Sequence, residues 1–344
     1  MIVEGAPGAQ DVERIEAVAR AAEEFDGVAP LGEQPLRALR APASGVRHLL
    51  VREDDSVRDD GSAREDDSAR DDDSPGGAVV GYAQISGSGA DATAELVVDP
   101  GHRRRGIGAE LLQAVLEREP GVAVWAHGAL PAAVALAESQ GLARTRELLK
   151  MRRRGADGPE LGDLRPDEGI ELGTLAEAAS EGGDRWPGLD ARAEFLRVNN
   201  AAFHWHPEQG GWTPAQLDER LAVDWVDLGA VFLAVDVAAG STGAGAGSAG
   251  AGAPRLAGFH WTKTVAEPGE PVEGEVYVVA VDPAYQGRGL GGVLTSVGVR
   301  HLEGPAGAES VVLYVEGDNH PAVRTYEKLG FAVESVDVTY SSRL

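Results

Sequence analysis

The sequence has no cysteine, only three lysines and no apolar run of the about 18 residues that a membrane-spanning helix needs. The absence of cysteine excludes disulfide bonds, cysteine-ligated zinc or iron–sulfur clusters and a cysteine nucleophile. The start, "MIVEGAPGAQDVERIE", lacks the basic and then apolar layout of a secretory signal. We therefore expect a soluble, cytoplasmic protein with no membrane partner.

Positive charge is also scarce. Lysine and arginine total 31 against 56 aspartates and glutamates, which gives a net charge of -25. A sequence-independent grip on nucleic acid or on an anionic membrane needs a basic surface, so both are disfavoured. Small molecules or proteins are the likelier partners.

Two low-complexity stretches lie inside the chain. The segment "REDDSVRDDGSAREDDSARDDDSPGG" is a six-residue acidic repeat, and we expect its residues 53–77 to form a disordered loop. The Gly/Ala/Ser-rich residues 238–254 should form a flexible loop. Each is flanked by alternating β-rich segments, so each is predicted to be the expanded loop of a hairpin.

The same series of elements occurs twice. The segments "TAELVVDP" and "EVYVVAVDP" read as strands that run into the glycine turns "VDPGHRRRGIG" and "VDPAYQGRGLG", and a helix, a strand, a glycine-ended helix and a final strand follow each turn. Because order and spacing recur over more than a hundred residues, we predict one α/β fold with a mixed sheet, used twice. The predicted domains are 1–155 and 169–344, joined by a Gly/Pro/Asp-rich linker at 156–168.

A turn that leaves a strand and opens a helix points unpaired backbone N–H groups at one spot, where the helix dipole also favours an anion. Glycines 106, 108, 289 and 291 let a phosphate approach, and arginines 103–105 and 288 add charge. A plain strand-to-helix turn is the alternative for either match alone. The glycine patterns of dinucleotide-binding folds and of P-loops are not present.

Gln286, Gly289, Gly291 and the segment "NHPAVRTYEKLGF" resemble the GCN5-related N-acetyltransferase (GNAT) family. The resemblance covers both halves and implies two tandem GNAT domains, each a splayed mixed sheet flanked by helices, with acetyl-CoA as co-substrate and no metal. In this family the pantetheine arm pairs with the strand before the turn, and the pyrophosphate lies on the turn. The implied coenzyme contacts in the second half are Val279, Ala280, Val281, Gln286, Gly287, Arg288, Gly289, Leu290, Gly291, Gly292, Asn319, His320, Pro321, Ala322, Val323 and Arg324.

The matching coenzyme positions in the first half are Leu96, Val97, Val98, Arg103, Arg104, Arg105, Gly106, Ile107 and Gly108. Whether this half binds acetyl-CoA is left open. Asn319 alone is equally explained as a helix N-cap.

Acetyl transfer to an amine needs a neutral nitrogen and a proton for the departing thiolate. Glu275 shares one face of its strand with residues 277, 279 and 281, so its carboxylate is the candidate base. By the family resemblance, Tyr326 is the candidate acid. An exposed glutamate and a core tyrosine are the alternatives. An ungapped alignment places Ala92 opposite Glu275 and Ala137 opposite Tyr326, so we predict that the first half is not catalytic.

The segments "VNNAAFHWHPEQGGW" and "GFHWTK" carry a narrower resemblance, to tandem acetyltransferases whose acceptor is the cysteinyl amine of a glucosamine–inositol pseudodisaccharide. That resemblance implies acceptor contacts at Glu33, Lys263, Glu275 and Tyr314, with the acceptor between the two domains. We expect a small-molecule amine acceptor and a monomeric protein. His204 and His206 have no third ligand nearby, so a metal is not expected. An aminoglycoside, a polyamine or a protein amino terminus is an alternative acceptor, and an acetyl-CoA sensor without turnover is an alternative function.

Overall fold

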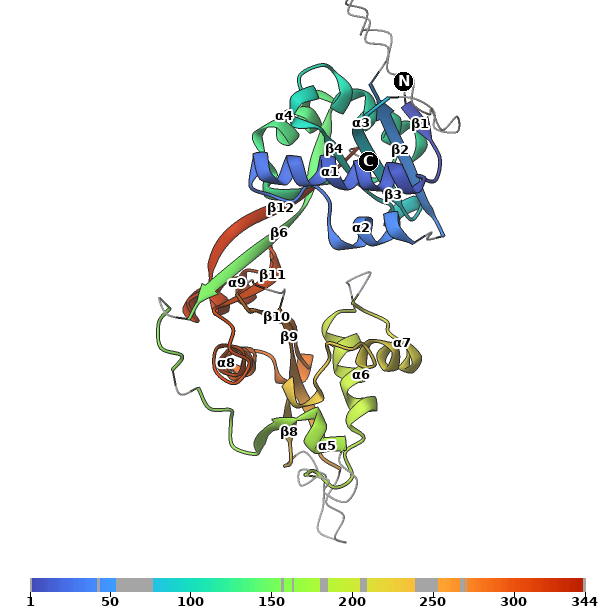
Figure 1. Cartoon of the computed structure of the whole chain (residues 1–344). Coiled ribbons are helices and arrows are strands. Elements are labelled where there is room, and N and C mark those ends of the chain that lie inside the picture. The colour runs from blue at the N-terminus through green and yellow to red at the C-terminus, as the bar shows by residue number, and fades with distance from the viewer. Residues whose placement is uncertain are drawn as a thin grey trace, which may run out of the picture. The chain divides into compact units, whose positions relative to one another are not determined.

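The computed structural model describes residues 2–41, 44–53, 77–155, 158–162, 164–179, 185–204, 209–238, 253–266, 269 and 271–342 (Figure 1). The chain divides into two compact units. Unit 1 combines Met1–Leu148 with Ser335–Leu344, and unit 2 is Leu149–Glu334. The predicted loops 53–77 and 238–254 lie almost entirely outside the described residues, as do parts of the predicted linker and of the "FHWHPEQGGW" segment.

Unit 1 is a sheet with helices on both faces. Its strands run in the order β1-β2-β3-β4-β5-β12-β6. Helices α1 and α2 pack on one face and α3 and α4 on the other. The elements are β1 (Ile2–Glu4), α1 (Ala9–Asp26), α2 (Glu33–Arg40), β2 (Val46–Arg52), β3 (Val79–Ser86), β4 (Thr93–Val98), α3 (Ile107–Arg118), β5 (Ala123–Ala126), α4 (Pro131–Ser139), β6 (Leu142–Arg154) and β12 (Ala332–Ser342).

Unit 2 repeats this arrangement, with strands in the order β11-β10-β9-β8-β7. Helix α6 packs on one face through Phe195, against Phe259 and Trp261, and α8 packs on the other face through Leu294, against Ala257. The elements are β7 (Ile170–Thr174), α5 (Leu175–Ala179), α6 (Ala191–Ala202), α7 (Pro214–Leu221), β8 (Val231–Asp236), β9 (Arg255–Val265), β10 (Glu273–Val281), α8 (Leu290–Glu303), β11 (Ser310–Glu316) and α9 (His320–Lys328).

The structure confirms the predicted duplication. Both predicted hairpins are antiparallel pairs, with Arg52 opposite Val79 and Asp236 opposite Arg255. The predicted strand, turn, helix, strand, helix, strand series is present in both halves. A glycine also recurs at one register position, Gly81 opposite Val98 and Gly258 opposite Val281, where a Cβ would come within 2.9 Å of Ile107 and of Leu294, respectively. This close approach lets α3 and α8 lie on their strands.

The boundaries of the two compact units differ from the domain boundaries 1–155 and 169–344 predicted from the sequence. The end of the last strand belongs to unit 1, where Val338 pairs antiparallel with Ala126 of β5. The end of β6 belongs to unit 2, where Arg152 forms ion pairs with Glu273 and Glu334. Pairing of these ends covers strand edges that would otherwise expose unpaired backbone groups. Among the helices of the described ranges, none is long and apolar enough to cross a membrane.

Candidate active site

Strands β10 and β11 of unit 2 diverge after a short parallel contact. Their pairing joins Glu273–Glu275 to Ser310–Val312, whereas β10 remains paired with β9 as far as Val281. The β11-facing edge of Val279–Val281 therefore presents N–H and C=O groups that these strand pairings leave free. This open edge is the feature that the family resemblance predicts for the pantetheine arm.

The turn after β10 supports that edge. Gly289 has φ of 76° and is the N-cap of α8, so the N–H groups of the first helical turn are available to an anion. Gln286 donates its side-chain amide to the carbonyl of Val281 at 3.2 Å, which fixes the end of the strand. Arg288 pairs with Asp167 at 2.6 Å. In these contacts both side chains face protein groups, and phosphate binding at the turn stays a prediction that rests on its backbone N–H groups.

Glu275 lies next to Lys263 in this unit. The two are opposite each other on β10 and β9, and Lys263 Nζ is 3.5 Å from Glu275 Oε2. Burial alternates along β10, but the pairing shifts by one residue at Tyr277, so Glu275 lies on the face of Lys263 and Trp261 while Val279 and Val281 lie on the opposite face, towards α8. The prediction that these residues share one face is therefore wrong. The carboxylate belongs to the last residue of β10 that pairs with β11, immediately before the open edge.

A β-bulge at Tyr277 corrects one detail of the sequence alignment. Val276 is opposite Thr262 and Val278 is opposite Trp261, so Tyr277 is an extra residue in β10, while β3 and β4 pair without such a shift. The ungapped alignment that put Ala92 opposite Glu275 is therefore off by one position. By the register of both neighbouring strands, the counterpart of Glu275 is Thr93, and the counterpart of Lys263 is Ser86. Unit 1 thus lacks the carboxylate, as predicted.

Helix α9 carries the candidate acid. Tyr326 packs edge-on against Phe331, with ring centroids 6.0 Å apart, and burial raises the pKa of its phenol to about 12. The hydroxyl is therefore protonated at neutral pH, as a proton donor must be. Asn319 caps this helix by accepting a hydrogen bond from the N–H of Ala322, which is the alternative role given above. Tyr314, on β11, is 49% exposed.

Sequence patterns did not reveal an aromatic cluster beside Glu275. Trp225, Trp261 and Tyr277 meet with ring centroids 5.1 to 5.9 Å apart. The ammonium of Lys263 lies 5.5 Å from the ring centre of Trp225 and 5.8 Å from that of Tyr277. Trp225 is distant in sequence from both strands, and nothing in the local pattern indicated that it would lie here.

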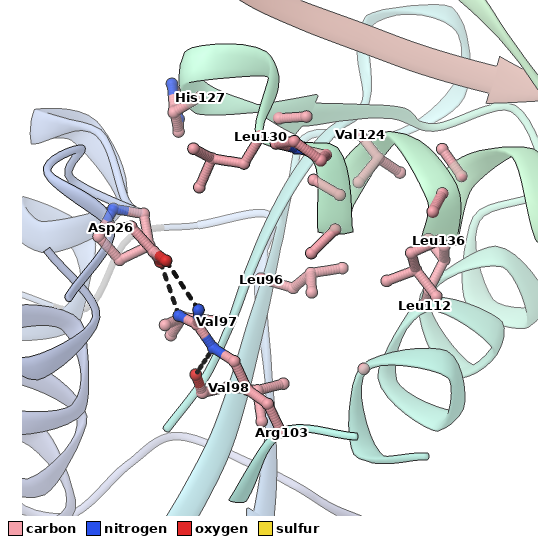
Figure 2. A pocket seen from close by; sticks show the side chains of 18 of the residues that line it. Asp26, Leu96, Val97, Val98, Arg103, Leu112, Val124, His127, Leu130 and Leu136 are labelled. Atoms are coloured by element: carbon pink, nitrogen blue, oxygen red, sulfur yellow. Dashed lines mark hydrogen bonds and ion pairs between the residues drawn. The ribbon is translucent and has the colours of Figure 1, made fainter. Parts of the chain in front are cut away.

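The unit 1 turn has the same design with different side chains. Arg103 takes the place of Gln286, donates to the carbonyl of Val98 at 3.1 Å and binds Asp26 through both terminal nitrogens (Figure 2). Its guanidinium is thus held by the strand end and by α1, whereas the prediction assigned it to a phosphate. Arg104 has φ of 64°, at the position where unit 2 has Gly287 with φ of 76°.

The left-handed conformation of Arg104 leads to a stability prediction. A non-glycine residue in this conformation is strained by about 1 kcal/mol. Substitution by glycine relieves this strain, but glycine also has more conformational freedom in the unfolded chain, which offsets part of the gain in stability. We expect Arg104→Gly to raise the free energy of unfolding by roughly 0.5 kcal/mol and Gly287→Ala to lower it by about 1 kcal/mol, measured by urea denaturation. Arg105→Gly is the matched control and should not stabilise. If both glycine substitutions changed the free energy of unfolding equally, the backbone strain assigned to Arg104 would be contradicted.

Unit 1 contains a cavity of about 690 Å³ at the point where β4 and β5 diverge (Figure 2). The parallel pairing of these strands joins only Thr93 to Ala123 and Ala94 to Val124. Most of the lining is apolar. Of the positions predicted to bind coenzyme in the first half, the cavity is lined by Leu96, Val97, Val98, Arg103, Arg104, Gly106 and Gly108.

His127 lines this cavity between two carboxylates. Its Nε2 is 3.2 Å from Glu95 and its Nδ1 is 3.4 Å from Asp337. Burial disfavours the charged ring, but the attraction of Asp337 and Glu95 outweighs burial and raises the pKa of His127 to about 9. The imidazolium therefore persists at neutral pH. Glu95 also accepts a hydrogen bond from the N–H of Gly32 at the start of α2.

The raised pKa of His127 predicts a pH-dependent stability. Because the folded pKa exceeds the unfolded value of 6.5, the contribution is complete below about pH 6.5 and is lost as the pH rises through 9. A shift of this size corresponds to on the order of 3 kcal/mol. In urea denaturation, the difference between wild type and His127→Gln should shrink by that order between pH 6 and pH 10. A difference that is constant across this range would refute the assignment.

The four predicted acceptor contacts are divided between the two units. Glu33 is at the start of α2 in unit 1, where it pairs with Arg37, and both side chains are 75% exposed. Lys263, Glu275 and Tyr314 belong to unit 2, where the structure brings Lys263 and Glu275 together. In the described ranges, no three histidine or acidic side chains are grouped as a metal site.

Comparison with known proteins agrees with this geometry. Residues 199–331 match the Acetyltransferase (GNAT) family, and residues 66–141 match an Acetyltransferase (GNAT) domain. The chain is 45% identical over 343 residues to the mycothiol acetyltransferase of Mycolicibacterium smegmatis, covering 98% of this chain and 97% of the relative. The chain belongs to the mycothiol acetyltransferase family.

A second mycothiol acetyltransferase, from Rhodococcus erythropolis, is 43% identical over 341 residues and covers 98% of this chain and 97% of its own. The chain has two GNAT domains and is an acyltransferase that uses acetyl-CoA. The family resemblance, the tandem fold and the coenzyme predicted from the sequence are thereby confirmed. The individual coenzyme and acceptor contacts stay predictions.

Solved structures support the tandem fold of this chain. A GCN5-related N-acetyltransferase from Sphaerobacter thermophilus superposes with a TM-score of 0.64 at 20% identity, covering 98% of this chain and 94% of that one. A tandem GNAT protein from the clavulanic acid biosynthesis pathway gives a TM-score of 0.61 at 18% identity, covering 99% and 97%. At these identities the likeness concerns the fold alone.

Proposed function

We propose that this protein transfers the acetyl group of acetyl-CoA to the cysteinyl amine of a glucosamine–inositol pseudodisaccharide and so forms mycothiol. The names of its relatives support this acceptor. The observation that carries the proposal is the position of Glu275, at the last residue of β10 that pairs with β11, just before the open edge at Val279–Val281. An amine next to the carboxylate is thereby next to the predicted thioester.

The reaction follows from these positions. Glu275 takes a proton from the ammonium of the acceptor, directly or through a water, and the free amine attacks the thioester carbonyl. Backbone N–H groups on the open edge of β10 stabilise the oxyanion that forms. The C–S bond then breaks, and Tyr326 donates its proton to the departing thiolate of coenzyme A. The nitrogen loses its second proton as the amide forms, and this proton restores the tyrosine through solvent. The products are the amide and coenzyme A, with the proton from the amine held by Glu275.

Binding of the acceptor is assigned to Glu33, Lys263, Glu275 and Tyr314, and binding of the coenzyme to the open edge, the glycine turn and the start of α9 in unit 2. We also assign an acetyl-CoA to the cavity of unit 1, in contact with Leu96–Val98 and with the turn at Gly106. That site has Thr93 and Ala137 in place of the base and the acid, so it is expected to bind coenzyme without chemistry. The reaction belongs in the cytoplasm, where acetyl-CoA is available.

The test is a direct assay of the product. Purified protein is mixed with acetyl-CoA and the cysteinyl glucosamine–inositol compound, in parallel with an aminoglycoside and a polyamine, and product mass is followed. Thiol dyes are unsuitable because this acceptor carries its own thiol. One acetyl group gained on the cysteinyl compound alone supports the proposal. Acetylation of another amine would keep the enzyme class and replace the acceptor, and coenzyme binding without turnover would favour a sensor.

A further inference from the structure

Tyr277, the extra residue of β10, lies along the strand between Glu275 and the open edge at Val279–Val281. It lies two positions after Glu275 and packs on Trp261, on the face of the sheet that carries Lys263 and Glu275, and it is 38% exposed. Because β4 has no bulge, Tyr277 has no counterpart in unit 1, which also lacks the Lys263–Glu275 pair. The additional ring and the chemical groups thus occur together in one unit of the duplicated fold.

Trp225 and Tyr277 together form an aromatic wall beside Glu275. Trp225 and Tyr277 meet edge to face, with ring centroids 5.1 Å apart and planes at 77°. Both pack on Trp261, which is 1% exposed and belongs to the core of unit 2. A part-exposed pair of rings on a rigid base offers apolar area at little conformational cost.

Lys263 adds a polar group to the wall. Its ammonium is near the centres of both rings and 3.5 Å from the carboxylate of Glu275. Aromatic surface with a few fixed polar groups is the usual composition of a small-molecule site. A pyranose or cyclitol ring matches this composition, because its C–H face packs on aromatic rings while its hydroxyls accept hydrogen bonds from an ammonium.

We propose that Trp225 and Tyr277 form a subsite that holds a hydroxyl-rich saturated ring of the acceptor and thereby selects acceptors that carry such a ring next to the amine. The inference rests on the proposed function, since it concerns the amine that Glu275 deprotonates. It adds two specificity-determining residues that bind the ring rather than the reacting amine. Ring-less amines are expected to use the same base but to gain nothing from the wall.

The test compares two amines that differ in the ring. Binding of the cysteinyl glucosamine–inositol compound and of cysteine amide is measured by calorimetry, and KM and kcat are measured with acetyl-CoA. Trp225→Ala and Tyr277→Ala should each raise the dissociation constant and the KM of the ring-bearing compound about tenfold, which corresponds to about 1.4 kcal/mol. They should leave cysteine amide and the KM of acetyl-CoA unchanged. Tyr277→Phe, which keeps the ring, should retain most of the affinity.

Val223→Ala is the matched control, because Val223 is 45% exposed in the same segment as Trp225. If an alanine variant does not fold, Trp225→Phe and Tyr277→Leu replace it. Unchanged affinity for the ring-bearing compound, or an equal loss for cysteine amide, would overturn the subsite. Wild-type protein that binds the ring-bearing compound but does not acetylate it would contradict the proposed function alone. Wild-type protein that does not bind the compound would overturn both.

Discussion

Replacing Glu275 by glutamine should lower kcat/KM for acetyl transfer by about a hundredfold at neutral pH, which is the scale of a positioned general base. The substitution keeps the shape of the side chain but removes the proton acceptor beside the open edge of β10. An α-amino group has a pKa near 8, so part of the acceptor is a free amine without enzymatic help, and this limits the loss.

The pH profile distinguishes a base from a structural carboxylate. As the pH rises from 6 to 9, the acceptor loses its proton to solvent, and the rate of Glu275→Gln should rise towards that of wild type. Glu309→Gln, which changes an exposed carboxylate before β11, is the matched control and should retain wild-type kinetics. A Glu275→Gln enzyme that is equally impaired at every pH would assign the residue to positioning of the acceptor instead.

Tyr326→Phe should reduce kcat about a hundredfold while the affinity for acetyl-CoA stays within about twofold, because the hydroxyl is assigned to proton donation only. The phenylalanine ring preserves the edge-on contact with Phe331, so folding stability should change little. Since the pKa of Tyr326 is about 12, this acid should cause no fall in kcat between pH 7 and pH 10. Rates measured over this range with saturating substrates test both statements.

Thr325→Val is the control for Tyr326. It removes a neighbouring hydroxyl on α9 that donates to the carbonyl of Pro321, within the helix. This variant should turn over normally. Wild-type turnover in Tyr326→Phe would exclude the tyrosine from proton transfer and would point to a water as the donor.

The sequence predicted the duplicated fold because its signals are local and periodic. Strand alternation, helical spacing and the glycine caps at Gly141 and Gly330, with φ of 71° and 85°, lie within single elements, and the structure bears them out. The pairing of Val338 with Ala126 joins residues far apart in the chain. No local pattern encodes such a partner, so the sequence repeat did not reveal that the last strand completes unit 1.

The site was predicted in part for the same reason. The strand period predicted one face for Glu275 and Val279, which is wrong because the bulge between them places the two side chains on opposite faces of the sheet. The bulge at Tyr277 leaves the alternation of buried and exposed residues along β10 intact, so it was not visible in the sequence and shifted the alignment that chose Ala92. The ring contact of Trp225 with Tyr277 and the hydrogen bond from Arg103 to Asp26 are tertiary contacts between separate elements. Such contacts depend on packing rather than on spacing.

The central claim is that chemistry takes place in unit 2 alone, within a fold used twice. The most direct measurement is product formation by the double variant Glu275→Gln/Tyr326→Phe, with acetyl-CoA binding titrated in the same preparation. The account predicts turnover at least a thousandfold below wild type, in the range expected for the combined loss of base and acid, with coenzyme still bound. Product formation near the wild-type rate would contradict the account, because the acetyl transfer would then have to occur without these two groups.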